Sequence, residues 1–142
     1  MKKFEVRIET FSHVTEDLDK VIRAMNYLIG FEIKNYRFKK LYGHWGNAII
    51  HVFTEIYEKE ANDFLIRLAN VLSEEDKKYL SYNIDLHLDE RYKLHLRFNK
   101  QKAFKNVFKI SKGDDVIKVT ISIPQLSKTA IVDFYKKIGL LL

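Results

Sequence analysis

Cysteine is absent from the chain of 142 residues, and this absence excludes three kinds of chemistry. The protein can form no disulfide, offers no thiolate nucleophile and cannot bind zinc through sulfur. No stretch approaches the roughly 20 apolar residues that a membrane-spanning helix needs. The N-terminal sequence alternates between polar and apolar residues, whereas a signal peptide contains a continuous apolar run. We therefore expect a soluble protein of the cytoplasm.

Proline and glycine are scarce, with one and five occurrences respectively. So few of these residues argue against linkers and low-complexity segments. The hydrophobic share of 46% and the aromatic share of 13% are enough for a substantial core. A domain of this size buries roughly 68–70% of the surface that its unfolded chain exposes. We expect one domain over residues 1–142.

Acidic residues are scarce in the last third of the chain. Residues 91–142 carry twelve Lys or Arg against three acids, residues 48–90 carry four against ten, and residues 1–47 carry nine against six. The net charge is +6. This asymmetry favours one basic surface that faces a polyanion. The alternative is an ordinary lysine-rich surface in contact with solvent.

Hydrophobic periodicity predicts the secondary structure. Alternation with a period of two predicts strands over residues 4–10, 31–41, 48–58, 93–98, 107–111 and 116–123. Helical spacing predicts helices over residues 16–29, 58–72, 74–87 and 128–138, with a single helical turn within residues 99–104. Thr15, Ser73 and Ser127 are the expected N-caps, and Gly30 is expected to end the first helix. Residues 84–88 fit a strand as well as a helix.

The resulting order of the main elements is βαββααβββα. Because strands and crossover helices do not alternate regularly, a doubly wound parallel sheet is disfavoured. The order predicts an α+β fold, with a mostly antiparallel sheet whose helices pack on one face. The other face would then be left for solvent or for a partner.

No catalytic motif is present in the sequence. There is no phosphate-binding loop, no nucleophile elbow and no dinucleotide fingerprint. The five histidines show no paired spacing on a helix; they are His13, His44, His51, His87 and His95. Asp114 and Asp115 follow a glycine and could bind a divalent ion for phosphoester hydrolysis. A hairpin turn explains the same residues more simply. We therefore expect neither a cofactor nor a metal ion.

Nucleic-acid binding has more support, because cations and aromatic residues gather around two predicted turns. Cations bind phosphates, aromatic faces stack on unpaired bases, and amides read base edges. The candidate RNA-binding residues are Lys39, Lys40, Tyr42, His44, Trp45, Asn47, Arg97, Lys100, Gln101 and Lys102. Lys105 belongs to the same basic segment, and Phe104 is expected to pack in the core.

Five stretches, taken together, resemble an archaeal domain family that is described as a predicted RNA-binding protein or a predicted exosome subunit. The stretches are RIETFSHVTEDLDKV, GHWGNAI, LSEEDKKYL, LHLRFNKQKAF and GDDVIKVTISIP, which occur in the family's order, and the resemblance covers about residues 5–124. The resemblance implies a fold like that of ribosomal protein L5 and a role linked to RNA. Ala48 and Asn99 depart from the proline and aspartate of the family pattern, and the amide of Asn99 weakens any metal site there.

Three hypotheses follow from the sequence. The first is a non-catalytic RNA-binding protein, an accessory factor in RNA processing or exosome-linked decay, whose 42–47 loop stacks on bases. The second is a protein-interaction subunit that docks its basic face on an acidic partner or on a ribonucleoprotein. The third is a metal-dependent phosphoesterase that uses Asp114, Asp115 and the histidines. The expected partners are RNA and subunits of an RNA-processing complex.

Overall fold

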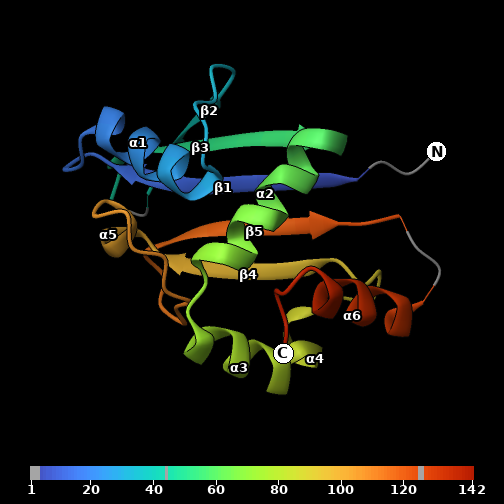
Figure 1. Ribbon diagram of the computed structural model, residues 1–142. Coiled ribbons are helices and arrows are strands. Elements are labelled where there is room, and N and C mark those ends of the chain that lie inside the picture. The colour runs from blue at the N-terminus through green and yellow to red at the C-terminus, as the bar shows by residue number, and fades with distance from the viewer. Residues whose placement is uncertain (1–3, 44, 125–126) are drawn as a thin grey trace.

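The computed structural model describes residues 4–43, 45–124 and 127–142, and its centre is a five-stranded antiparallel sheet (Figure 1). The strand order is β2-β3-β1-β5-β4. The strands are β1 (Glu5–His13), β2 (Arg37–Tyr42), β3 (Ala48–Tyr57), β4 (Leu94–Asn99) and β5 (Val116–Ser122). The helices are α1 (Leu18–Ile29), α2 (Glu58–Val71), α3 (Glu74–Tyr82), α4 (Ile84–His87), α5 (Lys100–Ala103) and α6 (Lys128–Lys137).

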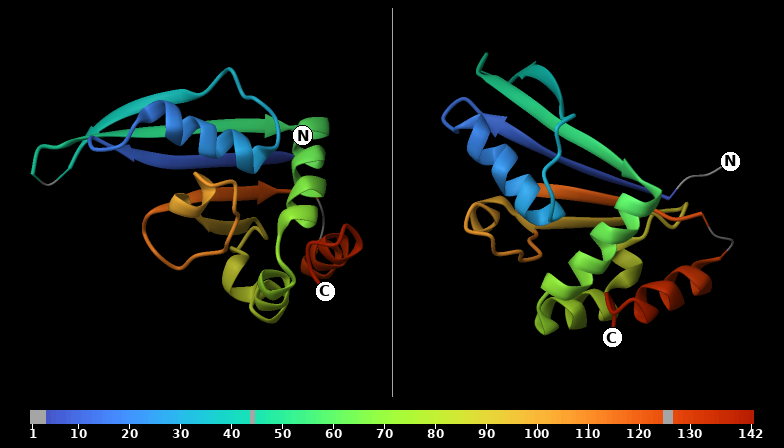
Figure 2. Two further views of the ribbon diagram at one scale, coloured as in Figure 1. Left: turned by 60° about the vertical axis from the view of Figure 1, so that its left-hand side comes forward. Right: turned by 45° about the horizontal axis from the view of Figure 1, so that its top comes forward.

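The hydrophobic core lies between the sheet and the helices that cover one of its faces (Figure 2). Along β1, buried and less buried residues alternate, so that Val6 and Ile8 point into the core. The same period of two operates in β4, where Leu94, Leu96 and Phe98 are buried. Strands β1 and β4 therefore give alternate side chains to the core and leave the others on the opposite face, whereas the edge strand β2 has no buried residue.

The predicted α+β class and the antiparallel sheet are confirmed. Ser73 and Ser127 cap α3 and α6 as expected, because each hydroxyl accepts a hydrogen bond from a backbone N–H of the first turn, at 3.1 Å. Gly30 ends α1 in the left-handed conformation. The expected N-cap at Thr15 is wrong: Asp17 caps α1, with its side chain accepting from the backbone N–H of Asp19 at 2.9 Å.

Two predicted strands are shorter than expected or missing. Residues 31–36 form no strand, since the side-chain oxygen of Asn26 holds this segment against α1 through the Ile33 amide (3.1 Å) and the Tyr36 hydroxyl (2.7 Å). Residues 107–111 make only an isolated bridge between Phe98 and Ile110, because the Ile110 amide donates to the Asp76 carboxylate at 3.0 Å. The described residues therefore form five strands, whereas the sequence predicts six.

The third predicted helix reaches residue 87, but in two pieces. The side-chain amide of Asn83 donates to the Tyr79 carbonyl at 2.9 Å and ends α3, after which α4 begins at Ile84. Phe104 packs against the core as expected. Among the described residues no helix is long and apolar enough to cross a membrane. The single domain over residues 1–142 and the likeness to ribosomal protein L5 stay predictions.

A candidate nucleic-acid interface

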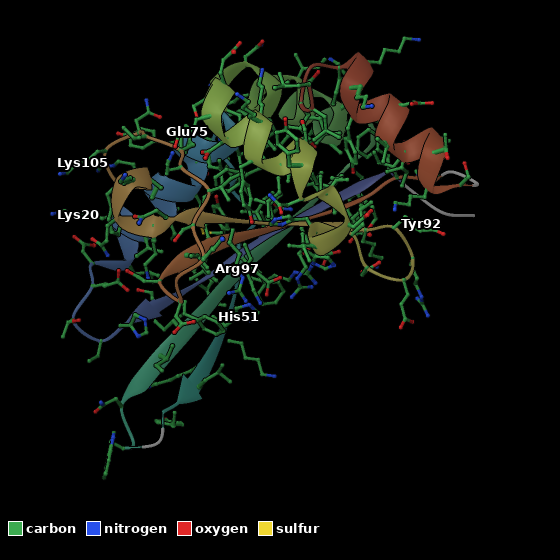
Figure 3. All side chains as sticks on the ribbon, turned by 90° about the horizontal axis from the view of Figure 1, so that it is seen from below. Lys20, His51, Glu75, Tyr92, Arg97 and Lys105 are labelled. Atoms are coloured by element: carbon green, nitrogen blue, oxygen red, sulfur yellow. The ribbon has the colours of Figure 1, made fainter. Side chains whose placement is uncertain are left out.

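The face of the sheet opposite the helices is a candidate interface, and we call it the open face. Figure 3 views the molecule from below, with the helices above the sheet and with His51 and Arg97 on the side away from them. Strand register places the members of this face side by side across the five strands. They include Arg37, Lys39 and Leu41 of β2; Ile49, His51, Phe53 and Glu55 of β3; Arg7, Glu9 and Phe11 of β1; Lys118 and Thr120 of β5; and His95 and Arg97 of β4.

Three aromatic rings form a continuous stack at the centre of the open face. Phe11 lies 5.0 Å from His51 between ring centroids, with planes 29° apart. His51 lies 4.8 Å from Phe53, with planes 26° apart. Antiparallel pairing of β1 with β3 sets Phe11 directly opposite His51, which brings the rings together. The Phe11 side of the stack remains accessible, because this residue is 42% exposed.

Arginines cover the other end of the stack. The guanidinium groups of Arg7 and Arg37 lie 4.8 Å and 4.9 Å from the centroid of the Phe53 ring. Both arginines also pair with Glu55, at 3.3 Å and 2.7 Å. The hydrogen bond from the Tyr57 hydroxyl and the charges of these arginines hold the pKa of Glu55 below its ordinary value, so the carboxylate stays ionised and keeps them in place.

Positive charge exceeds negative charge toward the two edges of the open face. Lys39 on β2, Arg97 on β4 and Lys118 on β5 form no ion pair with any described residue. Glu9 is the acid nearest the centre, and it is already engaged by Arg7 (3.0 Å) and His51 (3.1 Å). The edges of the face therefore offer unpaired cations on both sides of an aromatic centre.

The 42–47 loop lies at the tip of the β2–β3 hairpin, which projects from the body on the side away from the helices (Figure 3). Trp45 is 85% exposed and Tyr42 is 70% exposed. Lys40 and Asn47 are exposed as well. Lys40 and Tyr42 lie on the other side of β2 from Lys39, with the Lys40 Nζ atom 5.7 Å from the centroid of the Tyr42 ring. His44 lies outside the described residues.

The second predicted turn, α5, contributes less than expected. Lys100 is only 1% exposed, and its Nζ atom contacts the Phe11 carbonyl (2.7 Å), Glu16 (2.9 Å) and Asp115 (2.8 Å). It cannot bind a phosphate on the surface, so this candidate is withdrawn. Gln101 is exposed but donates to Asp115 at 2.8 Å, and Lys102 is exposed.

The two turns are also far apart, contrary to the expected cluster. The hairpin tip lies beyond the open face, whereas α5 lies with the helices on the opposite side (Figures 2 and 3). Only Arg97, on the strand before α5, faces the same side as Lys39.

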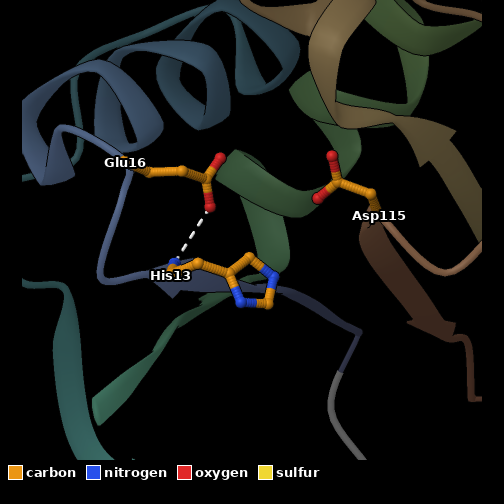
Figure 4. Close-up of side chains that lie close together, drawn as sticks. All are labelled: His13, Glu16 and Asp115. Carbon is orange, nitrogen blue, oxygen red and sulfur yellow. Dashed lines mark hydrogen bonds between the residues drawn. The ribbon is translucent and has the colours of Figure 1, made fainter. Parts of the chain in front are cut away.

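His13, Glu16 and Asp115 form the one group of possible metal ligands among the described residues, with ligand atoms within 4.8 Å of one another (Figure 4). The Lys100 ammonium group already pairs with both carboxylates, and Glu16 also accepts from the His13 amide at 2.9 Å. Partial burial raises the pKa of Asp115, but hydrogen bonds from Lys100 and Gln101 outweigh this effect and hold it below its ordinary value. Asp114 is not part of this group. The cluster therefore reads as a structural ion-pair network.

Sequence reasoning missed the aromatic stack and several of its neighbours. The missed residues are Arg7, Phe11, Arg37, Phe53 and Lys118, and His51 was considered only as a metal ligand. Arg7, Arg37, Phe53 and Lys118 stand in strands that alternation identifies, whereas Phe11 lies just past the end of the predicted strand over residues 4–10. Their meeting depends on strand order and register, which the period of two does not give. A search for aromatic residues at outward positions of separate strands would have found the candidates, though not their contacts.

Comparison with known proteins relates the chain to archaeal proteins. RNA-binding protein PAB1135 from Pyrococcus abyssi is 37% identical over 139 residues, which cover 93% of this chain and 90% of the relative. An uncharacterised protein of Methanocaldococcus jannaschii, MJ0213, is 28% identical over 82% of each chain. The crystal structure of protein AF2318 from Archaeoglobus fulgidus has a TM-score of 0.83 and 27% identity, and covers 96% of this chain and 99% of that one.

A further solved structure shares the fold. Mth689 from Methanothermobacter thermautotrophicus, described as a DUF54 protein, has a TM-score of 0.80 at 22% identity, over 97% of this chain and 99% of that one. A family model described as RNA binding matches residues 5–123, which include all five strands and helices α1 to α5. On this match and on the 37% identity to the Pyrococcus protein, the chain belongs to the RNA-binding family.

Proposed function

We propose that the protein is a non-catalytic RNA-binding protein that holds single-stranded RNA across the open face. The observation that carries the proposal is the Phe11–His51–Phe53 stack on a sheet face that no helix of the described residues covers. Membership of the RNA-binding family and the name of the Pyrococcus relative support RNA as the ligand.

A single strand fits this face better than a duplex. Aromatic side chains stack on bases that are not already paired, and a four- or five-stranded sheet offers a flat surface on which such bases can spread. In duplex RNA the bases are stacked inside the helix, and a protein reads mainly phosphates and 2′-hydroxyls. An aromatic centre would contribute little to such binding.

The cations at the edges of the open face supply the contacts to phosphate. Lys39 lies on one side of the stack, and Lys118 lies on the other. Contacts of this kind release counterions, so the affinity falls as the salt concentration rises, with a log-log slope of about −0.7 for each phosphate on a single strand. Trp45 at the projecting tip of the hairpin provides a further ring for a strand that extends past the sheet.

Phe11→Ala is the first test of the stack. Because stacking of one base on an aromatic ring contributes about 1–3 kcal/mol, we expect affinity for a labelled single-stranded RNA to fall at least fivefold in fluorescence anisotropy. Tyr82→Ala is the matched control, because Tyr82 is an exposed aromatic residue on α3 that lies away from the open face. Equal affinities for the two variants would contradict the proposed interface.

Trp45 gives an independent reading, because it is the only tryptophan in the chain. Salt-sensitive quenching of its fluorescence by single-stranded RNA places the ligand at the hairpin tip. Binding that leaves the fluorescence unchanged confines the RNA to the sheet. Complete absence of binding at low salt would overturn the RNA-binding proposal.

A second candidate function is supported by the opposite side of the hairpin. Phe38 and Tyr42 are exposed on β2, which is an edge strand, and an edge strand with exposed aromatic residues is suited to protein docking. This surface provides a way to join an RNA-processing complex as an accessory subunit. Co-purification that survives nuclease treatment and is lost in Phe38→Ser supports this role, whereas release by nuclease assigns the association to RNA.

A further inference from the structure

Strands β1 and β5 separate from each other at one end of the open face. The pairing of β1 with β5 ends at Glu9 and Lys118, although β1 continues to His13 beside β3. Beyond this point the Thr10 hydroxyl donates to the Val116 carbonyl at 2.8 Å and takes the place of a strand-to-strand contact. The separation opens a hollow in the sheet surface next to the accessible end of the aromatic stack.

The hollow has a volume of about 140 Å³. Since a water molecule takes about 30 Å³ of liquid volume, the hollow has room for about four or five waters, or for a large part of one planar ring. Its lining residues are Glu9, Thr10, Phe11, Arg97, Asp114, Val116 and Lys118. Two cations, one aromatic ring and one unengaged carboxylate thus meet in a space of nucleobase scale.

The carboxylate of Asp114 is the unusual member of this set. Glu9 is held by Arg7 and His51, but Asp114 makes no side-chain hydrogen bond or ion pair with any described residue. An acid at the rim of a surface that binds RNA weakens phosphate contacts by repulsion. Asp after a turn glycine is ordinary, but this carboxylate also lines the hollow, where it can accept hydrogen bonds from a ligand because an ionised carboxylate is purely an acceptor.

We infer that the hollow is a nucleobase subsite that selects guanine, a conclusion that rests on the proposed RNA-binding function. The base lies against Phe11 and extends the stack outward. The Asp114 carboxylate accepts from the two adjacent donors of guanine, N1–H and the N2 amino group. Arg97 donates to the O6 and N7 acceptors on the other edge of the same base, and Lys118 at the rim of the hollow is left for a phosphate contact.

The other bases match this set of groups less well. Adenine has an acceptor at N1, which would face the carboxylate. Cytosine offers one amino donor next to the acceptor N3, and uracil offers one N–H between two carbonyls. Guanine alone combines a pair of adjacent donors with a pair of acceptors that cations can reach.

The test compares labelled uridine octamers that carry one central guanosine, adenosine, cytidine or inosine, with affinity measured by anisotropy. We expect the guanosine octamer to bind the full-length protein about tenfold more tightly than the other octamers, which is within the range for a paired contact to a base. Inosine lacks the N2 amino group, and it is expected to lose most of this advantage.

Asp114→Asn assigns the preference to the hollow. The side chain of Asp114 is exposed and makes no hydrogen bond or ion pair with any described residue, so the variant is expected to fold normally. We expect it to bind guanosine and inosine octamers equally, and all octamers slightly more tightly than the wild type because a negative charge is removed. Asp63→Asn on α2, exposed on the helix side, is the matched control and should retain the preference for guanosine.

The outcomes separate this inference from the function on which it rests. Failure of every octamer to bind overturns the RNA-binding function itself. Binding without a preference for guanosine, or a preference that survives in Asp114→Asn, overturns the guanine subsite and leaves RNA binding in place.

Discussion

The two faces of the sheet are built from the same five strands and obey different rules. On the helix-covered face, residues such as Val6, Ile8 and Val52 are fully buried. On the open face, cations, acids and aromatic rings alternate with them along the same strands and remain partly exposed. The covered face therefore sets stability through burial, and the open face is available for binding because little of the fold depends on it.

Lysine shows the same contrast within one segment of chain. Lys100 and Lys102 both belong to α5, yet the first lies inside the protein with two carboxylates and the second lies in solvent. The position of the side chain decides whether a cation serves the fold or is available to a ligand. The following four predictions test this division between faces, from the largest expected effect to the smallest.

Phe98→Ala should affect stability far more than binding. Phe98 is fully buried on the covered face of β4, so its truncation is expected to lower the free energy of unfolding by about 3–5 kcal/mol. Urea unfolding followed by circular dichroism measures the change. Its neighbour Arg97 points to the open face, and Arg97→Ala should alter unfolding by less than about 0.5 kcal/mol. Equal losses of unfolding free energy in the two variants would contradict the proposed division between a stabilising face and a binding face.

Lys100→Met should destabilise the protein by about 3 kcal/mol. The substitution leaves the Glu16 and Asp115 carboxylates close together without their shared cation, and breaking a buried ion pair in this way is strongly unfavourable. Lys102→Met, on the exposed side of the same helical turn, should have little effect on unfolding. If Lys100→Met were stable and bound RNA less tightly, Lys100 would have to belong to the RNA-binding surface after all.

Lys118→Ala should act on binding and spare the fold. Lys118 is exposed and unpaired among the described residues of the open face. Removing one phosphate contact should reduce the magnitude of the log-log salt slope by about 0.7 on single-stranded RNA. Lys136→Ala on α6 is the control of equal charge and should leave the slope unchanged. A steeper loss for Lys136→Ala would move the interface to the helix side.

The smallest expected effect is the pH dependence that Asp115 contributes. Its pKa in the folded protein lies below that in the unfolded chain, where it is about 3.9. The ion pair with Lys100 therefore stabilises the protein above about pH 4, and this contribution is lost as the pH falls through the lower, folded-state pKa. The stability difference between wild type and Asp115→Asn should shrink below pH 4. A difference that stays constant down to pH 2 would argue against this ion pair.

Local sequence patterns account for the fold better than for the interface. Alternation in β4 and the serine caps of α3 and α6 depend on neighbouring residues, so they could be predicted. The burial of Lys100 could not, because Glu16 stands 84 positions away in the chain. Segment 31–36 was misassigned for a similar reason: alternating residues looked like a strand, but the side chain of Asn26 holds this segment in a loop.

The strand order has a consequence for the folding pathway. β1 pairs with β5 across the middle of the sheet, and the Thr10–Val116 contact there spans 106 positions of the chain. Contacts of such long range form late and slow the folding of a domain, because a large loop must close before they stabilise anything. A partly folded chain can pair β2, β3 and β1 and present the aromatic stack, but it lacks the wall that Arg97 and Lys118 provide. During folding, the protein therefore gains the ability to distinguish one base from another only when β5 and β4 pair with the rest of the sheet.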